Sequence, residues 1–563
     1  MLKRWKIKGS NPQLQVQLSN ALDIPPIVSQ LLINRGITTS QEAQSFLKAD
    51  ISALDDPLLL KDMDLAIKRI KQAKESKEFV LIYGDYDVDG ITSSVLLKDI
   101  LTSLGVKAIN YIPHRMSEGY GLNLGIIEYA KQKGVRLLIS VDCGINAFHQ
   151  VEALNQNNID VIIIDHHQPS DGPLPKAVAV IDPKRQDCLY PFKDFASVGL
   201  VAKLSQGLLG EILEDHWPLI AVGTIADVVS LRGENRIFVK EGLPRLNGTK
   251  NKGLLALLDV AKIKGKKFNP YHVGFILGPR INATGRMGSA QEALDLLLSQ
   301  DEAEAYTLAH SLEEQNARRQ KIQNDMVQEA MSIVEQEVNF KDHHVIVIQK
   351  EGWHKGVLGI VASRIMEKYY RPTIVISTEE GIGTASARSI AGFHIFEALS
   401  HCANHLENFG GHKSAAGLTV KEENISRFRQ VINAFAREVI SLEDLIPSLD
   451  IDCEIPLAGL NLDLTYLIES LEPYGEGNRV PLFCSRKLAV KSQPVVLGKD
   501  TIKFWVTDGR TTISAVGFGM GQLRDMISSA ANVDLAYSLD IDDWNKAPAV
   551  CLKLKDIKVS ETA

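Results

Sequence analysis

The sequence has few cysteines and no long hydrophobic run. No stretch of about 18 uncharged apolar residues occurs, and the basic first residues, MLKRWKIKGSNPQLQ, lack the apolar segment of a signal peptide. Neither export nor membrane insertion is therefore predicted. The cysteines lie far apart and form no C-x-x-C pair, which argues against a zinc ribbon and a disulfide framework: Cys143, Cys188, Cys402, Cys453, Cys484 and Cys551. A reducing cytoplasm is the expected compartment.

An excess of positive charge is also missing, because the formal net charge is -7. This value argues weakly against a protein that coats nucleic acid non-specifically, but it leaves room for a local basic groove. Neither internal repeats nor low-complexity segments are present. A chain of 563 residues suffices for three or four domains of about 100 to 200 residues each.

Four apolar runs each end in acidic or histidine residues, at 79–90, 135–145, 159–167 and 219–231. Helix-like amphipathic segments separate the first three, which is the alternation of a parallel sheet with helical crossovers. We interpret all four runs as strands. Ligands bind outside the carboxyl ends of strands in such sheets, so we expect the polar ends to converge on one edge.

The patterning divides the chain into five regions. Neither Gly nor Pro occurs from Asp301 to Asp342, where helix formers predominate, so a long connecting helix is predicted. A second alternating region follows, and the tail shows short strands separated by turn residues, as in a small barrel. The expected boundaries are 1–75 (helical), 76–300 (catalytic α/β domain), 301–340 (connecting helix), 341–445 (second α/β domain) and 446–563 (all-β barrel).

The stretch GDYDVDG places Asp85, Asp87 and Asp89 at alternate positions after a buried strand. A solvated turn is the favoured interpretation of such a pattern taken alone. An EF-hand loop is excluded, because Leu96 stands where a bidentate Glu is required and because a strand precedes the loop. Buried carboxylates without partners are costly, so these side chains must meet water, a cation or a metal ion.

The other strand ends supply Asp142, the DHH sequence at 165–167, and Asp227. Alone, DHH would be an ordinary strand end with exposed or hydrogen-bonded histidines, but four such coincidences favour a common site. Carboxylates with imidazole and no thiolate suit Mn²⁺ or Mg²⁺. Two such ions can activate water and neutralise charge on a phosphoryl group.

The motifs DYDVDG, VDCG, DHH and GTIADVVSL, in this order, resemble those of the DHH phosphoesterase superfamily, and FGGHKSAAG resembles its DHHA1 domain. IPHRMSEGYGLN, GPRINATGRMG, WHKGVLGIVASR, SARSIAGFHI and EPYGEGNRVPLF resemble the RecJ family of bacterial single-strand-specific exonucleases. The resemblance implies two α/β domains, a DHH core and a DHHA1-type domain, joined by a long helix, and a C-terminal OB-fold-like barrel. It also implies 5'-to-3' hydrolysis of single-stranded DNA to mononucleotides in recombination and repair, with a helicase and a single-stranded-DNA-binding protein as possible partners.

The same resemblance implies the site residues. Two divalent ions, Mn²⁺ or Mg²⁺, would be bound by Asp85, Asp87, Asp89, Asp142, His166 and Asp227, with Asp142 bridging them. His167 would contact or protonate the reacting phosphate; Arg280, Asn282 and His412 would lie near the scissile phosphate; and Arg115, Ser386 and Arg388 would bind a terminal 5'-phosphate. Candidates for base stacking in the tail are Phe504, Trp505 and Trp544, although aromatic residues of small barrels more often belong to the core.

Two other functions remain open at this point. One is a phosphodiesterase of short oligonucleotides or cyclic dinucleotides, which would need neither the long helix nor the barrel. The other is a non-catalytic binding protein, which is disfavoured because every ligand position is filled.

Overall fold

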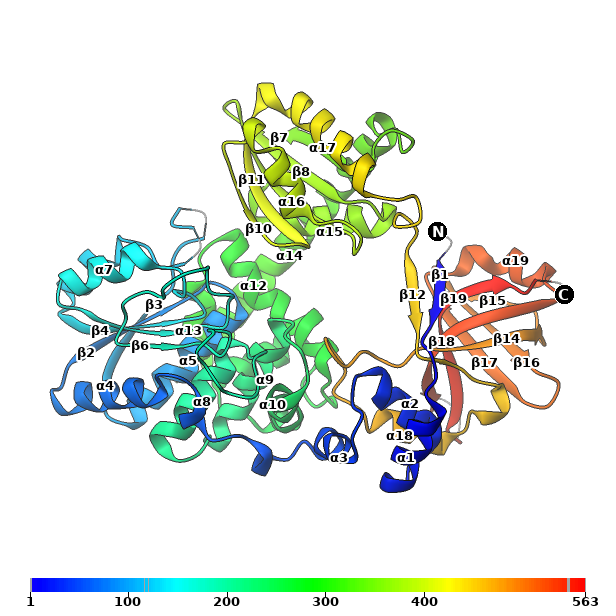
Figure 1. The fold of residues 1–563 in the computed structure, drawn as a ribbon, viewed down its shortest axis with the longest axis horizontal. Coiled ribbons are helices and arrows are strands. Elements are labelled where there is room, and N and C mark those ends of the chain that lie inside the picture. The colour runs from blue at the N-terminus through cyan, green and yellow to red at the C-terminus, as the bar shows by residue number, and fades with distance from the viewer. Residues whose placement is uncertain (1–2, 116, 120, 544–546, 562–563) are drawn as a thin grey trace.

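The computed structural model describes residues 3–115, 117–119, 121–543 and 547–561. Figure 1 shows two α/β domains and a C-terminal barrel, with the long helix α14 (Glu302–Glu337) running between the two α/β domains. The predicted fold class is thus confirmed.

The first domain contains a five-stranded, wholly parallel sheet in the order β3-β2-β4-β5-β6. Its central residues are aligned in register, Ile82 with Ile139 and Ile139 with Ile162, and all three are buried. Burial on both faces explains why these strands are continuous apolar runs. The strands are β2 (Phe79–Gly84), β3 (Lys107–Tyr111), β4 (Val135–Val141), β5 (Asp160–Ile164) and β6 (Ala179–Ile181).

Helices cover both faces of this sheet and extend the domain toward α14. They are α4 (Met63–Glu75), α5 (Val88–Ser103), α6 (Ile126–Gln132), α7 (Phe148–Gln156), α8 (Ser197–Leu209), α9 (Trp217–Ala226), α10 (Gly233–Arg245), α11 (Lys252–Val260), α12 (Gly278–Met287) and α13 (Gln291–Leu298). A π-helix, His272–Leu277, leads directly into α12.

The prediction that 219–231 is a strand is wrong, because this run forms helix α9. Residues 217–225 are all buried, so the helix is apolar on every side and shows no periodicity that would distinguish it from a buried strand. Pro218 in the first turn is compatible with a helix start. Asp227 nevertheless follows the last residue of α9 directly.

Helix α14 spans about 54 Å at ~1.5 Å per residue. Its N-terminus is capped by Asp301, whose side chain accepts a hydrogen bond from the Glu304 N–H at 2.8 Å. The second domain that follows has a sheet in the order β10-β11-β9-β8-β7, in which only the β7–β8 pair is parallel. Its elements are β7 (Ile346–Glu351), α15 (Leu358–Tyr369), β8 (Thr373–Glu379), β9 (Ile382–Arg388), α16 (Ile395–His401), β10 (Asn408–Gly411), β11 (Ala415–Lys421) and α17 (Ile425–Val439).

The C-terminal sheet has the order β13-β14-β18-β19-β17-β16-β15 and closes into a barrel through a further β14–β16 pairing. Its elements are β13 (Cys453–Glu454), α18 (Leu462–Glu469), β14 (Phe483–Val490), β15 (Val495–Leu497), β16 (Thr501–Thr507), β17 (Thr512–Phe518), α19 (Arg524–Ser529), β18 (Asn532–Asp542) and β19 (Ala549–Val559).

The N-terminal segment packs against this barrel, and its last helix also contacts the first domain, where Arg236 Nε donates to the Phe46 carbonyl at 2.7 Å. Strand β1 (Arg4–Ile7) pairs in parallel with β12 (Ser448–Ile451), the segment that leads into the barrel. Helices α1 (Pro12–Leu22), α2 (Pro26–Asn34) and α3 (Ser40–Lys48) follow, and residues of α2 and α3 share a hydrophobic core with barrel strands. The two ends of the chain therefore stabilise one unit.

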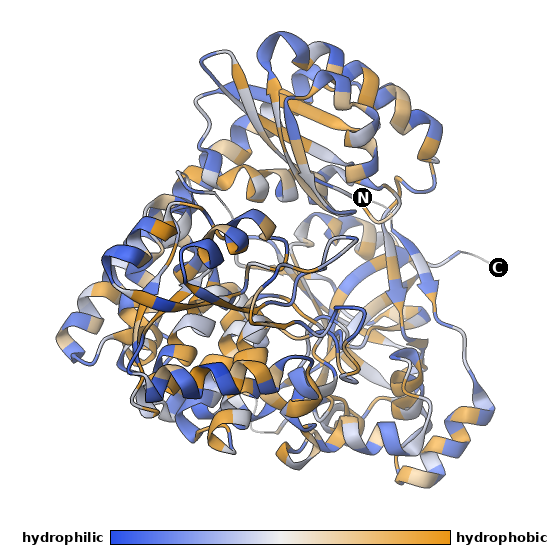
Figure 2. Ribbon diagram, turned by 60° about the vertical axis from the view of Figure 1, so that its left-hand side comes forward, coloured by the Kyte–Doolittle hydropathy of each residue, from blue (hydrophilic) through white to orange (hydrophobic). Residues whose placement is uncertain are grey.

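Hydrophobic residues concentrate in the sheets and on the inward faces of helices, as Figure 2 shows. Over the described ranges, no helix combines the length and apolar character needed to cross a membrane.

Candidate active site

The three aspartates after β2 are placed by different local contacts. Asp87 caps α5, because its Oδ1 accepts a hydrogen bond from the Gly90 N–H at 3.1 Å. Asp89, in the first turn of α5, accepts N–H bonds from Ser197 at 2.6 Å and Val198 at 2.9 Å. The N-terminus of α8 therefore fixes the orientation of the Asp89 carboxylate.

Gly90 permits this turn. A Cβ atom at this position would lie 2.4 Å from the backbone carbonyl oxygen of Asp85, a distance that real Cβ atoms do not reach. The close approach holds Asp85 against the start of α5, so that three carboxylates follow one strand within five residues.

The imidazole of His166 brings in carboxylates from three other elements. Its Nε2 lies 3.2 Å from Asp142 Oδ1, 3.5 Å from Asp227 Oδ2 and 3.9 Å from Asp89 Oδ2. Asp142 follows β4 in a left-handed conformation with φ of 63°. The polar ends of β2, β4, β5 and α9 thus converge at one edge of the sheet, as expected.

The cluster resolves into neighbouring sets of potential ligands whose atoms lie within 4.8 Å of one another: Asp85, Asp87 and Asp142; Asp89, His166 and Asp227; and Asp142, His166 and His167. Asp142 belongs to two of them, as does His166. The structure therefore brings together all six residues predicted to bind metal, together with His167.

The raised pKa values of the carboxylates show that their charged forms lack a cation to stabilise them. Burial, reinforced by the charge of Asp87, raises the pKa of Asp85 to about 8 and that of Asp89 to about 7. Burial and the charge of Asp89 raise the pKa of Asp227 to about 9. Asp85 Oδ1 and Asp227 Oδ2 are buried and accept no hydrogen bond. Burial and the neighbouring His167 lower the pKa of His166 to about 3, which keeps a neutral imidazole for coordination. These donors fit hard divalent cations.

A carboxylate holds the second histidine of DHH. Asp165 is buried, and its oxygens accept hydrogen bonds from the N–H groups of Ile145, His166 and His167 at 2.8–3.1 Å. Asp165 Oδ1 also lies 2.7 Å from Nδ1 of the His167 ring. Burial opposes charge on both groups, yet these bonds hold the pKa of Asp165 at about 2 and raise that of His167 to about 9.

Arginines gather beside the carboxylates, where the two α/β domains meet. Arg388 Nη1 donates to Ser386 Oγ at 3.1 Å on β9, and Arg286 Nη1 donates to the Gly356 carbonyl at 3.0 Å. The Arg115 guanidinium lies over the Tyr86 ring, 4.8 Å from its centroid.

Within the described part of the chain, no carboxylate forms an ion pair with Arg115, Arg286 or Arg388. Burial and the charges of Arg115, Arg319 and Arg388 lower the pKa of Arg286 to about 10. These arginines are partly buried and lack carboxylate partners, which suits them to bind an anion, and the guanidinium fork matches phosphate.

The three residues predicted near the scissile phosphate have different surroundings. Arg280 Nε lies 2.5 Å from Glu313 Oε2 on α14, so its charge is already partly neutralised. Asn282 on α12 lines a small cavity beside Arg286. His412 lies on the exposed turn between β10 and β11 and accepts a hydrogen bond from the Ser414 N–H at 3.4 Å. Among the hydrogen bonds and ion pairs of the described residues, none joins His412 to the carboxylate cluster.

The structure contradicts the prediction that Phe504 stacks against bases. Phe504 is only 1% exposed and belongs to the barrel core, so it is not available to bases. Successive side chains of a strand point to opposite faces, and the adjacent Trp505 is 45% exposed. Trp544 lies outside the described residues.

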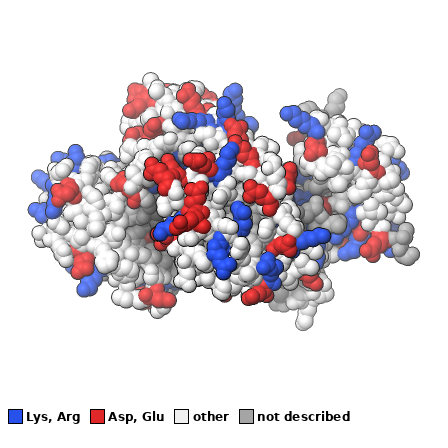
Figure 3. All heavy atoms as spheres, turned by 90° about the horizontal axis from the view of Figure 1, so that it is seen from above, with Lys and Arg blue, Asp and Glu red and all other residues white. Residues whose placement is uncertain are grey.

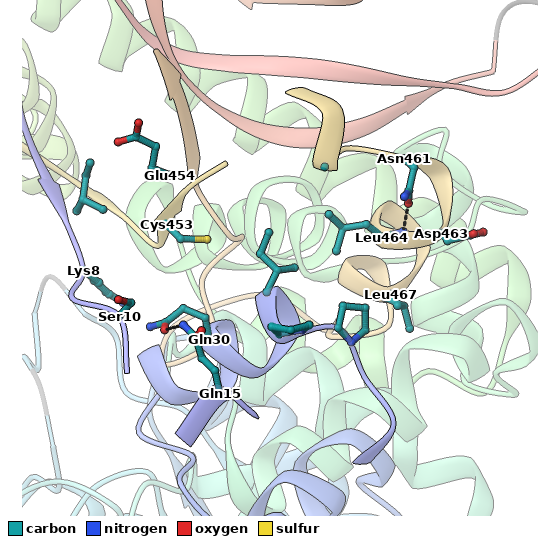
Figure 4. A pocket seen from close by; sticks show the side chains of 15 residues that line it. Lys8, Ser10, Gln15, Gln30, Cys453, Glu454, Asn461, Asp463, Leu464 and Leu467 are labelled. Atoms are coloured by element: carbon teal, nitrogen blue, oxygen red, sulfur yellow. Dashed lines mark hydrogen bonds between the residues drawn. The ribbon is translucent and has the colours of Figure 1, made fainter. Parts of the chain in front are cut away.

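Figures 3 and 4 show a face of the molecule coloured by charge and a second cavity. The face in Figure 3 mixes acidic and basic side chains, without a coat of positive charge. Figure 4 shows a cavity of about 690 Å³ between the N-terminal helices and the barrel, lined by residues such as Gln15, Gln30, Asn461 and Leu464. It contains neither the carboxylate cluster nor an arginine group, so the candidate site remains at the edge of the first sheet.

Comparisons with known proteins show the family to which the chain belongs. Residues 79–224 match the DHH family, N-terminal domain; 342–438 match the DHHA1 domain; and 451–556 match the RecJ OB domain. The single-stranded-DNA-specific exonuclease RecJ of Bacillus subtilis is 38% identical over 99% of this chain and 71% of its own length. The chain belongs to the RecJ family.

Solved structures of this family superpose on the whole chain. RecJ of Thermus thermophilus in complex with Mn²⁺ is 29% identical, with a TM-score of 0.85 over 99% of this chain and 80% of that one. The Mg²⁺ complex of the same protein is 28% identical, with a TM-score of 0.79 over 99% and 79%. The RecJ fold therefore extends through both α/β domains and the barrel.

The sequence analysis missed one carboxylate at the same sheet edge. Asp182 follows β6 directly, is buried, and its Oδ2 accepts no hydrogen bond. Burial raises the pKa of Asp182 to about 7. The signal was the apolar run AVAVID at 177–182, which is too short to stand out as a strand.

Proposed function

We propose that this chain is a metal-dependent exonuclease that hydrolyses phosphodiester bonds from the 5' end of single-stranded DNA and releases mononucleotides, in DNA recombination and repair. The observation that carries the proposal is that a group of carboxylates and a group of arginines lie side by side, and that neither is neutralised by an ion partner. Buried carboxylates without a counter-cation lie beside partly buried arginines without a counter-anion. A metal ion and a phosphate backbone would satisfy both.

Two Mn²⁺ or Mg²⁺ ions would be held by Asp85, Asp87, Asp89, Asp142, His166 and Asp227, with Asp142 shared. Bound there, such ions supply an activated water nucleophile at neutral pH and neutralise charge on the phosphoryl group. The Thermus thermophilus relative has been crystallised with either metal, which supports the choice.

Protein side chains would then position the substrate and move a proton. Asp165 engages Nδ1 of His167 and so orients the ring, and the imidazole would contact the reacting phosphate or protonate the leaving 3'-oxygen. Arg280 and Asn282 would contact the scissile phosphate. His412 would join them from the second domain if the turn between β10 and β11 closes over the strand.

The direction of degradation would follow from a pocket for a terminal phosphate. Arg115, Ser386 and Arg388 would bind the 5'-phosphate next to the N-terminus of α15, since a Cβ on Gly359 would lie 2.6 Å from Arg388 Nη2. A helix N-terminus with two arginines favours a doubly charged terminal group over a singly charged internal one. The 5' end would thereby be fixed one nucleotide from the metal centre.

The supply of substrate and the compartment belong to the same proposal. A helicase or a single-stranded-DNA-binding protein would present the strand, and Trp505 on the barrel would stack against its bases. The six cysteines are all unpaired, which supports a reducing cytoplasm.

The test uses a strand of about 40 nucleotides labelled at either end, as single strand and as blunt duplex, with Mn²⁺. We expect rapid release of the 5' label as a mononucleotide from the single strand only, and no release by Asp89→Ala. Release from the 3' end first would refute the polarity. Intact long strands with turnover of dinucleotides or cyclic dinucleotides would instead support a small-substrate phosphodiesterase.

A further inference from the structure

A small cavity of about 140 Å³ lies where the first domain, the connecting helix and the second domain meet. Its lining includes Ala226, Asn282, Arg286, Arg319 and Ile360. Ala226 directly precedes the cluster residue Asp227, so the cavity adjoins the carboxylates. Typical small-molecule sites measure roughly 300–1,000 Å³, so this cavity suits one group of a ligand rather than a whole nucleotide.

Arg319, in the middle of α14, is held in place by two neutral amides of its own helix. Its Nη2 donates to Asn316 Oδ1 at 2.7 Å, and its Nη1 donates to Gln323 Oε1 at 2.9 Å. Both amide side chains are buried. The guanidinium is therefore oriented without being neutralised.

The remaining donor of Arg319 has no partner. Its Nε is buried and forms no hydrogen bond, and no carboxylate pairs with Arg319 among the described residues. Arg280, by contrast, is paired with Glu313 on the same helix. A half-buried cation with an unused donor is costly unless an anion completes it. Arg286, the second arginine of the cavity, lacks a carboxylate partner as well.

The lining shows which anion fits. It contains none of the carboxylates of the metal cluster and, of the residues proposed to contact the scissile phosphate, only Asn282, so a phosphate here lies beside the one being hydrolysed. It also contains none of Arg115, Ser386 and Arg388, so the phosphate is not the terminal one. A single strand that occupies both of those places has one further phosphate next to the scissile bond, on its 3' side.

We propose that Arg319, together with Arg286, binds the backbone phosphate that follows the scissile phosphate on the 3' side. This inference rests on the proposed function and adds a third phosphate site to it. The connecting helix is then part of the binding site as well as a spacer between domains, and it selects strands of at least three nucleotides.

The test compares 5'-phosphorylated substrates in the presence of Mn²⁺. A dinucleotide has only the scissile linkage, whereas a trinucleotide has one more, which can be made uncharged as a methylphosphonate. Loss of a charge-assisted hydrogen bond is worth about tenfold or more, so the wild-type chain should cleave the first linkage of the methylphosphonate trinucleotide about tenfold more slowly in kcat/KM.

In Arg319→Gln this difference between charged and uncharged trinucleotide should fall to about twofold or less, and kcat/KM should drop more for the trinucleotide than for the dinucleotide. Arg319→Lys should retain part of the difference, and Arg318→Gln, at the exposed neighbouring position, all of it. An Arg319→Gln protein as sensitive to the methylphosphonate as wild type would overturn this inference alone. A wild-type chain that cuts neither substrate nor longer strands would contradict the proposed function instead.

Discussion

Asp165 Oδ1 lies 2.7 Å from Nδ1 of His167, and the same carboxylate accepts three backbone N–H groups around it. The buried aspartate therefore fixes both the loop and the ring that it carries. His167 is held beside Asp142 and His166, each of which belongs to two of the ligand sets.

Replacing Asp165 by Asn should impair the chemical step more than DNA binding. The amide cannot orient and charge-stabilise the imidazole as the carboxylate does, so we expect kcat to fall about 100-fold while KM changes only a few-fold. Steady-state kinetics on labelled single strands measure both. A raised KM with an unchanged kcat would show that Asp165 does not act through His167.

Gly90→Ala should disrupt the metal site without touching any ligand. The new Cβ would meet the Asp85 carbonyl oxygen at 2.4 Å, and because this atom belongs to the backbone, the turn must shift. Misdirected ligands typically cost 10- to 100-fold, so Mn²⁺-dependent activity should fall at least about tenfold. Gly248→Ala is the control, since a Cβ there has nothing within 4 Å. Equal activity of the two variants would be incompatible with the close approach described here.

The strands that carry the site could be predicted because parallel strands buried on both faces are short apolar runs, as at β2, β4 and β5. Helix α9 could not be told from a strand, since burial on every side removes its periodicity. Neighbours on one strand, Phe504 and Trp505, could not be assigned to opposite faces of the barrel, because both are aromatic. The convergence of Asp142 and His166 followed from the parallel topology, whereas Asp227 reaches the same edge from the end of helix α9, which was predicted as a strand. The absence of carboxylate partners for Arg286 and Arg319 is visible only in three dimensions.

Arg388→Gln should remove the preference for a 5'-phosphate. Arg388 and Ser386 lie in contact on β9, beside the first turn of α15, so the loss of one guanidinium should weaken use of 5'-phosphorylated strands about tenfold or more. Strands with a 5'-hydroxyl should be affected much less. Competition between the two strands in one reaction measures the preference directly, and a preference that survives the substitution would place the terminal phosphate elsewhere.

Substitutions of the neighbouring residues Phe504 and Trp505 should have different effects, one on stability and the other on DNA binding. Trp505→Ala should weaken binding of a long single strand by about 1–3 kcal/mol, as expected for a lost stacking platform, with little effect on unfolding. Phe504→Ala should destabilise the barrel by about 3–5 kcal/mol through the cavity that it leaves. Fluorescence anisotropy without metal and thermal unfolding provide the two measurements. Unaltered DNA affinity in Trp505→Ala would remove this residue from the binding surface.

Metal removal should make stability depend on pH in a defined direction. In the metal-free chain the pKa values of Asp85, Asp89 and Asp227 rise to about 8, 7 and 9 through burial and mutual repulsion, against about 4 when unfolded. The folded state then holds protons that the unfolded state has lost. This contribution to stability is complete below about pH 4 and disappears as the pH rises through 7 to 9. Mn²⁺, which displaces those protons, should therefore stabilise the chain more at pH 9 than at pH 6.

The most direct measurement of the central claim is a calorimetric titration of the metal-free chain with Mn²⁺ at pH 8, in two buffers with different ionisation enthalpies. The account predicts two ions per chain, release of protons on binding, and loss of one or both ions in Asp142→Asn, with hydrolysis lost in parallel. Fewer than two ions in the wild-type chain, or full binding in Asp142→Asn, would contradict it.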